Sequence, residues 1–186
     1  MDINDAIFGR RSVREYAEGP VDRQTIHRLI DAAVRAPNAV NQQPWMFTVV
    51  RDKTVLDGIS RDAKAHMLAN MPASPHSEHF HLLLRDPKFH IFYHAPVLIV
   101  ISAVAPSPWI VEDCALAAEN LMLVAYANRL GTCWIGFAQG FLNTAPGKKA
   151  LGIPAACVPV APIIVGHPKT MPPPVPRKDP EIRWVG

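Results

Sequence analysis

The chain has 186 residues, of which 49% are hydrophobic and 19% are charged, so a folded globular protein is expected and a disordered one is not. The net charge of +3 is too small to indicate nucleic-acid binding, and no stretch reaches the apolar length of a membrane span. The N-terminal residues do not resemble a signal peptide, and the three cysteines are widely spaced. We therefore expect a reducing cytoplasm as the setting.

Amphipathic patterns dominate the first third of the chain. Asp2 and Asp22 are N-cap residues for two helices, because apolar residues follow each of them at helical spacing. In chain order, we expect a helix from Asp2 to about Gly9, a helix from Asp22 that ends before Pro37, a buried strand over 45–50 and a weaker helix over about 53–67.

The middle of the chain combines an irregular segment with two strongly apolar ones. Residues 70–92 have no clean period, and we expect at most a short helix around 79–84. PVLIVISA, residues 96–103, predicts a strand. Residues 108–129 predict a long helix that is apolar nearly all round, so it should be buried in a core or an interface.

The C-terminal third predicts short elements followed by an extended arm. We expect a strand over 132–137, a short helix over 143–151 and a strand in the later half of 157–168. Pro159 and Pro162 should confine that last strand to an edge or a late start. The prolines of 167–186 favour an extended arm. Strands and helices are mixed without βαβ alternation, so we predict one α+β domain over 1–186.

Two polar segments are candidates for a binding site. Arg10, Arg11, Ser12 and Arg14 offer guanidinium forks and a hydroxyl, which suit phosphate oxygens, although a solvated helix end is an equally ordinary interpretation. APNAVNQQPW, residues 36–45, presents carboxamides that could contact an amide-like ring edge, or simply form a turn.

The remaining sequence patterns are weaker indications of a ligand, metal or catalytic site. In GTCWIGF, residues 131–137, Gly136 would let backbone approach a flat ligand closely, unless the segment is only a packed strand. HSEHFH, residues 76–81, with His90 and His94 lacks regular metal-ligand spacing, so we expect a polar surface loop and no metal. Glu112 and Asp113 are read as first-turn residues of a helix. No GxSxG, Walker or GxGxxG motif is present.

Taken together, these segments resemble the FMN-dependent nitroreductase family, and the similarity spans nearly the whole chain. The motifs are specific in combination and in this order. They are RRSVREY (10–16), PVDRQTIHRLIDAAVRAPNAVNQQPWMFTVV (20–50), YHAPVLIVI (93–101), DCALAAENLMLVAYANRLGTCWIG (113–136) and PRK (176–178).

The resemblance implies a homodimer with a mainly antiparallel sheet flanked by helices and with two FMN molecules at the subunit interface. At the phosphate end of FMN it assigns contacts to Arg10, Arg11 and Ser12. It assigns the pyrimidine edge of the flavin to Arg14. The late phosphate contact is implied for Arg177, together with Lys178.

The same resemblance assigns the ring end of the cofactor to two further segments. Pro37, Asn38 and Ala39 would reach the flavin from the partner chain, with Asn38 and Ala39 standing where family members often have serine. Asn41 and Gln43 would supply polar contacts to the ring. The stretch whose backbone would lie near the reactive N5 comprises Trp134, Ile135 and Gly136.

The expected function is that of an FMN-dependent oxidoreductase that uses NADH or NADPH to reduce nitroaromatics, quinones or similar planar acceptors by ping-pong hydride transfer. No side-chain acid or base is expected, because the flavin performs the chemistry. A flavin-destroying or dehalogenating enzyme on the same scaffold remains an alternative, as does a flavin-sequestering protein without catalysis. An anion- or nucleic-acid-binding protein is the most distant alternative.

Overall fold

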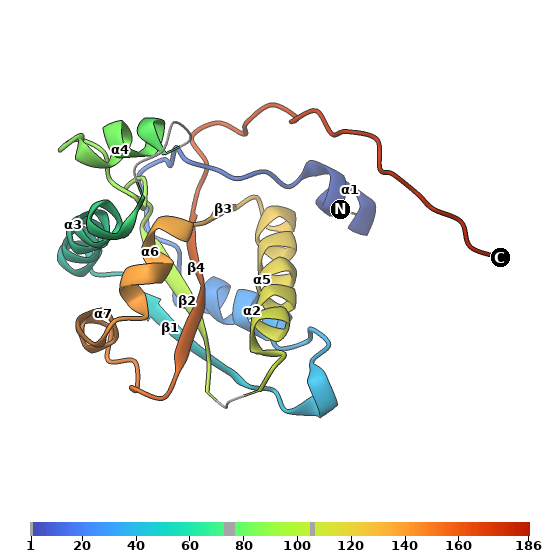
Figure 1. The fold of residues 1–186 in the computed structure, drawn as a ribbon. Helices are drawn as coiled ribbons and strands as arrows, with labels where there is room; N and C mark the ends of the chain where they lie inside the picture. The colour runs from blue at the N-terminus through green and yellow to red at the C-terminus, as the bar shows by residue number, and fades with distance from the viewer. Residues whose placement is uncertain (1, 73–76, 105–106) are drawn as a thin grey trace.

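The structure is a computed structural model that describes residues 2–72, 77–104 and 107–186. Its strands form one sheet in the order β1 (Trp45–Val50), β2 (Val97–Ala103), β4 (Val158–Gly166) and β3 (Gly131–Trp134), and all neighbouring strands are antiparallel. Helices cover both faces of this sheet (Figure 1). The predicted α+β class, with an antiparallel sheet flanked by helices, is confirmed.

One face of the sheet is covered by α2 (Arg23–Ala33) and α5 (Ile110–Ala127), which pack against each other. The Asp22 side chain caps α2 by accepting a hydrogen bond from the Thr25 amide at 2.8 Å, as its position predicted. Apolar residues of α2, α5 and alternate positions of β2 and β4 form one hydrophobic core. The long apolar helix predicted over 108–129 is therefore present as α5.

The opposite face is covered by α3 (Lys53–Asn70), α4 (Glu78–Arg85), α6 (Gly136–Leu142) and α7 (Ala145–Ala150). These helices and the other alternate positions of the sheet form a second core. All residues of β2 are buried because both of its faces are covered, which explains its unbroken apolar sequence. The helix expected over 53–67 extends to Asn70, and the short helix expected around 79–84 is α4.

The N-terminal segment runs beside the sheet after α1 (Ile3–Gly9). The Val13 amide donates to the Thr132 carbonyl at 2.9 Å, and the Ala17 amide donates to the His167 carbonyl at 2.9 Å. The Lys169 amide donates to Glu15, and beyond it the described arm has neither helix nor strand (Figure 1). The segment that carries the arginines thus lies between the sheet and the start of the arm.

The prediction for Pro159 and Pro162 was wrong, because β4 begins at Val158 and lies in the interior of the sheet. The Pro162 carbonyl accepts from the Ile135 amide at 2.8 Å, and the Pro159 carbonyl accepts from the Asn143 side chain at 2.8 Å. Both prolines therefore face the side on which β3 has already ended, where no strand requires an amide hydrogen. At these two positions β4 has no described strand partner on the β3 side, so it is locally an edge strand although it lies inside the sheet.

Two other strand predictions need correction. The strand expected over 132–137 ends at Trp134, and Gly136 begins α6, whose buried residues Ala138, Phe141 and Leu142 have helical spacing that two glycines obscure in the sequence. Strand β1 is an edge strand and mostly half-buried, and it is not the fully buried strand that its apolar sequence suggested. The helix expected over 143–151 starts at Ala145 after the cap residue Thr144.

Candidate functional site

The arginine-rich segment after α1 lines a small cavity of about 280 Å³. The arm forms the other wall of this cavity, because Arg177 reaches it although it is 167 positions from Arg10 in the sequence. Lys178 is exposed and does not line the cavity. The described lining consists of Arg10, Arg11, Ser12, Arg14, Pro172, Val175 and Arg177. Five of the predicted contact residues are therefore brought together, four of them cationic.

The first two arginines are held by short contacts while part of each guanidinium stays unpaired. Arg11 Nη1 donates to the carbonyls of Phe8 at 2.6 Å and Arg10 at 2.8 Å. Arg10 Nε lies 3.5 Å from Glu119 Oε1, an ion pair without hydrogen-bond geometry. In the described part of the chain, the buried Nε atoms of Arg10 and Arg11 have no hydrogen-bond acceptor. Buried cationic donors without acceptors are costly, and an anion such as a phosphate group would satisfy them.

A second cavity, of about 420 Å³, adjoins the first and shares Arg14 with it. Its wall includes the predicted stretch of Trp134, Ile135 and Gly136 at the junction of β3 and α6. A Cβ atom added to Gly136 would meet no described atom within 4 Å, so the space beside this glycine is open. That opening has the property a flat ligand needs in order to approach the backbone.

Aromatic side chains that the sequence reasoning missed form the rest of the second cavity. Phe80 and Phe137 make an edge-to-face contact with ring centroids 5.8 Å apart, and the Arg14 guanidinium lies 5.9 Å from the Tyr93 ring centroid. Met67 completes this wall. Phe80 lies in the irregular 70–92 segment and Phe137 in the unpredicted helix, so neither had a periodic signal. Tyr93 lies within the quoted YHAPVLIVI motif but was not identified as a site residue.

Besides Arg14, two weakly acidic groups line the second cavity, the Tyr93 phenol and the Cys133 thiol, and the pKa of each is raised. Burial raises the pKa of the Tyr93 phenol, and Arg14 opposes this shift only in part. Burial also raises the pKa of the Cys133 thiol, so this cysteine lacks the thiolate character of a nucleophile. The side chains around the cavity therefore provide shape, one positive charge and apolar surface, and no evident general base.

The other predicted contact segment, residues 37–43, lines neither of these cavities. It forms a tight loop around a 3-10 turn, in which Val40, Asn41 and Gln43 have left-handed φ angles of 44°, 55° and 48°. The Asn38 side chain accepts a hydrogen bond from the Gln43 amide at 2.8 Å. Val40 is 87% exposed. Backbone of this kind costs free energy and persists only where the surrounding structure imposes it.

Asp113 fixes that loop and was interpreted too simply from the sequence. It does lie in the first turn of α5, but its side chain is buried and accepts a hydrogen bond from the Ala39 amide at 3.0 Å. Trp45 Nε1 donates to the Asp113 carbonyl at 3.2 Å. No local pattern indicates this role, because the Asp113–Ala39 contact joins residues 74 positions apart.

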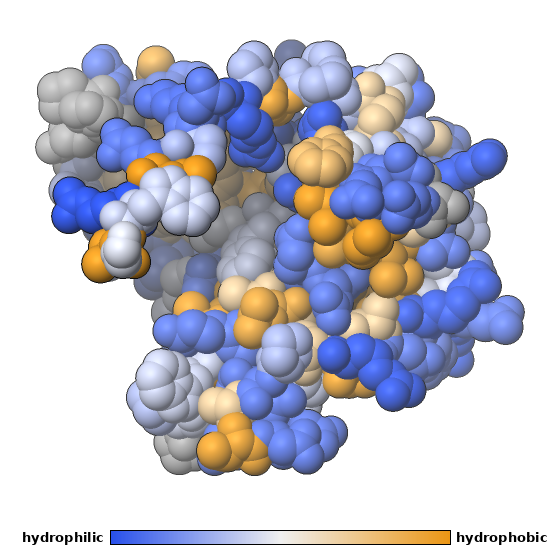
Figure 2. All heavy atoms as spheres, turned by 90° about the vertical axis from the view of Figure 1, so that its right-hand side faces the viewer, coloured by the Kyte–Doolittle hydropathy of each residue, from blue (hydrophilic) through white to orange (hydrophobic). Residues whose placement is uncertain are grey.

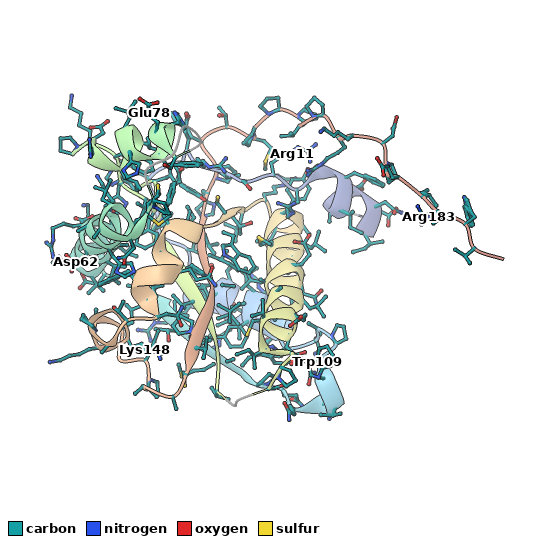
Figure 3. All side chains as sticks on the ribbon, viewed as in Figure 1. Arg11, Asp62, Glu78, Trp109, Lys148 and Arg183 are labelled. Carbon is teal, nitrogen blue, oxygen red and sulfur yellow. The ribbon has the colours of Figure 1, made fainter. Side chains whose placement is uncertain are left out.

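The loop and Gly9, which precedes the arginines, contact opposite ends of α5, while the Arg10 side chain reaches Glu119 in the middle of the helix. A Cβ at Gly9 would collide with the Tyr126 ring in the last turn, whereas Ala39 is bound to Asp113 in the first turn. Thirteen residues separate these positions, which is about 20 Å along a helix. In Figure 3, Arg11 is labelled near the upper end of α5 and Trp109 beyond its lower end. One chain therefore does not combine both groups of predicted contacts in one cavity.

Two remaining expectations concern the setting of the protein. The three cysteines are free and buried. None of the described helices has the length and apolar character needed to cross a bilayer.

Comparisons with known proteins agree with these features. The profile described as the nitroreductase family matches residues 7–167, which leaves the arm outside the match. Proteins assigned as NADH dehydrogenase/NAD(P)H nitroreductase are similar to this chain in Methanothermobacter thermautotrophicus, with 29% identity over 92% of this chain and 80% of the relative, and in Archaeoglobus fulgidus, with 30% identity over 88% and 83%. The FMN-bound nitroreductase structure from Bacteroides fragilis has a TM-score of 0.85 with 24% identity and covers both chains completely. The chain belongs to the nitroreductase family.

Proposed function

We propose that the chain is an FMN-dependent oxidoreductase that uses NADH or NADPH to reduce planar acceptors such as nitroaromatics or quinones. The observation that carries this proposal is the pair of adjoining cavities joined by Arg14, one cationic and one aromatic. A phosphate-bearing planar cofactor needs this combination. Family membership and the names of the two archaeal relatives support the same conclusion.

In this proposal the cationic cavity holds the FMN phosphate. Arg10, Arg11 and Arg177 supply donors to the phosphate oxygens, and the buried unpaired Nε atoms of the first two arginines are satisfied. The Ser12 hydroxyl contacts the ribityl end. Lys178 adds positive charge near the arm without lining the cavity.

The aromatic cavity holds the flavin ring, with Arg14 at its pyrimidine edge and the backbone of 134–136 near N5. When bound, FMN supplies the chemistry, since it takes hydride from the reduced nicotinamide and passes it to the acceptor in a ping-pong cycle. Arg14 stabilises the negative charge that reduction places on the ring. Phe80, Phe137 and Tyr93 exclude water and offer flat apolar surface to a planar acceptor.

The proposal includes a homodimer with the cofactor at the subunit interface. The strained loop around Asn41 and Gln43 lines neither cavity of its own chain and is held at the end of α5 opposite to the end that Gly9 contacts, so its contacts would reach the flavin of the partner. The outer face of α1 and α5 also leaves apolar side chains exposed, and apolar spheres interrupt the polar surface on that side (Figure 2). The exposed residues on these elements are Ile3, Ile7, Phe8, Val111 and Leu116. A second copy would cover them.

The first test is a visible absorbance spectrum of the purified protein, recorded before and after anaerobic addition of NADH or NADPH. We expect a flavin spectrum that bleaches with at least one nucleotide and returns when a nitroaromatic or quinone is added. Bound flavin that neither nucleotide reduces would favour the sequestering protein. Loss of the flavin itself in oxygen, without an added acceptor, would favour the flavin-destroying alternative. Absence of flavin after reconstitution with FMN would contradict the proposal.

A further inference from the structure

A third cluster of polar residues lies outside the two cavities of the candidate site. Asp57 of α3 and two histidines of the loop before β2, His90 and His94, place one potential ligand atom each within 4.8 Å of one another. His90 Nε2 is 3.1 Å from Asp57 Oδ1, and the two imidazole centroids are 4.5 Å apart. We propose that this cluster is a binding site for a divalent transition-metal ion such as Zn²⁺.

The distances suit a metal of this size after a small adjustment. Ligand atoms at bonds of about 2.0–2.1 Å in a tetrahedral site are about 3.4 Å apart. The His90–Asp57 separation already matches that spacing. His94 is exposed, so its ring can rotate to close the remaining gap. Two imidazoles and one carboxylate select Zn²⁺, Co²⁺ or Ni²⁺ over Mg²⁺ and Ca²⁺, which prefer oxygen ligands.

His90 is prepared for coordination by its surroundings. Its side chain is only 11% exposed, and burial, followed by the nearby His94, lowers its pKa below the ordinary value. The His90 Nδ1 atom accepts a 3.2 Å hydrogen bond from the Phe92 amide. Coordination through Nε2 would move the ring proton to Nδ1 and break that long hydrogen bond, which is a modest cost.

The cluster opens into a cavity of about 490 Å³ whose wall includes Pro20, Val21 and Pro96. This space gives an ion an entry path and room for water in the remaining coordination positions. Lys53 is the one direct competitor, because its ammonium group lies 2.6 Å from Asp57 Oδ2. The Lys53 ammonium group contacts Asp57 Oδ2, whereas His90 faces Asp57 Oδ1, and the Lys53 side chain is 78% exposed. The carboxylate can therefore keep its contact with Lys53 while Oδ1 binds an ion.

The site is separate from the proposed cofactor site, although the two are neighbours in the chain. Tyr93 lines the aromatic cavity and His94 lines this one. Both residues have left-handed φ angles, 50° and 55°, so the backbone between the two cavities is strained. The proposal rests on the Asp57–His90–His94 geometry alone and does not depend on the reaction at the flavin.

The test is isothermal titration of untagged, FMN-loaded and chelator-treated protein with ZnCl₂, together with the visible spectrum after addition of CoCl₂. We expect about one ion per chain and Co²⁺ absorption bands that indicate nitrogen ligation. His94→Asn, which tolerates the left-handed backbone, and Asp57→Asn should each weaken binding about ten-fold or more. His27→Ala removes an exposed histidine of α2 and should leave binding unchanged.

The variant Lys53→Met distinguishes a metal site from an anion site in this cavity. Removing a positive charge should favour a bound cation and disfavour a bound anion. Removing the competing ammonium group should tighten Zn²⁺ binding by up to about five-fold. A weaker affinity in Lys53→Met would overturn the proposal. So would full Zn²⁺ binding by His94→Asn, or no binding by the unsubstituted protein.

Discussion

Arg14 is the residue at which the two adjoining cavities meet, so its removal should affect both of them. Arg14→Ala should weaken FMN binding about ten-fold or more, because a hydrogen bond from a charged donor is lost. It should also slow flavin reduction by NADH or NADPH. Equilibrium titration with FMN and stopped-flow reduction measure the two effects.

The control for this substitution is Arg61→Ala, which removes an arginine that is 75% exposed on α3. That variant should bind and reduce FMN as the unsubstituted protein does. Unchanged FMN affinity and reduction rate in Arg14→Ala would show that Arg14 has neither assigned role.

Gly136 tests whether the open space beside the β3–α6 junction receives a flat ring. Gly136→Ala should leave the unfolding temperature of the cofactor-free protein almost unchanged, since the new methyl group meets no described atom within 4 Å. It should weaken FMN binding about ten-fold, because that methyl group would occupy ligand space. Gly58→Ala on α3, where the nearest atom is Arg61 Nη2 at 4.0 Å, is the matched control. Equal FMN affinity in the two variants would show that the flavin ring does not lie against the backbone of Gly136.

At the scale of single residues, local chemistry was predictable and long-range contacts were not. The arginines around Ser12 lie within five residues, and their guanidinium groups suggested an anion site, with a solvated helix end as the other interpretation. The contact of Asp113 with Ala39 depends on how α5 packs against the loop, which neither residue reveals alone. The meeting of Asp57 with His90 likewise joins positions 33 apart, so the sequence suggested only a polar loop.

Among the helices, α2 offers a direct test of capping. Hydrogen bonds from the Thr25 side chain and amide lower the pKa of Asp22. Because the folded pKa lies below the unfolded value, the stabilisation is fully present above the ordinary pKa of 3.8 and is lost as the pH falls through the folded pKa. Asp22→Ala should lower the Tm by about 2–4 °C at pH 7 and by less at pH 3.

Thermal denaturation followed by circular dichroism at the two pH values measures this difference, and Asp22→Asn should retain most of the cap. A Tm difference between the Asp22→Ala variant and the unsubstituted protein that stays constant from pH 7 to pH 3 would contradict the pKa argument.

The elements themselves were predicted where a cap and a helical period agreed, as in α2, or where a long apolar run could only be a buried helix, as in α5. Prediction was wrong where pairing partners decide the outcome. Pro159 and Pro162 are tolerated inside β4 because β3 is short, and the length of a neighbouring strand cannot be read from the prolines. Helix α6 was missed because Gly136 and Gly140 interrupt its pattern, although its apolar residues pack on α3.

At the scale of the whole molecule, the C-terminal arm is the described segment least attached to the rest of the chain. In the described chain, no hydrogen bond joins residues 170–186 to the body, and Trp184 at its end is 88% exposed. A chain truncated after Lys169 should keep its sheet and, with it, the other elements of the fold. It should also bind FMN about ten-fold more weakly, since Arg177 is removed.

Light scattering after size-exclusion chromatography measures the mass of the truncated protein, and circular dichroism checks that it is folded. A folded truncated chain with full FMN affinity would show that Arg177 does not contribute to cofactor binding.

The length of α5 has one more consequence, which concerns the activity of dimers that combine two different variant chains. If the arginines of one chain and the strained loop of the other complete each site, two different defects can rescue each other. Arg14→Ala would impair both proposed FMN sites of its own homodimer. The double substitution Asn41→Ala with Gln43→Ala would do the same. In a random mixture half of the dimers are mixed, and each of these has one undamaged site of two, so about a quarter of full activity should return. Interallelic complementation of this kind would be impossible if every site were built within a single chain.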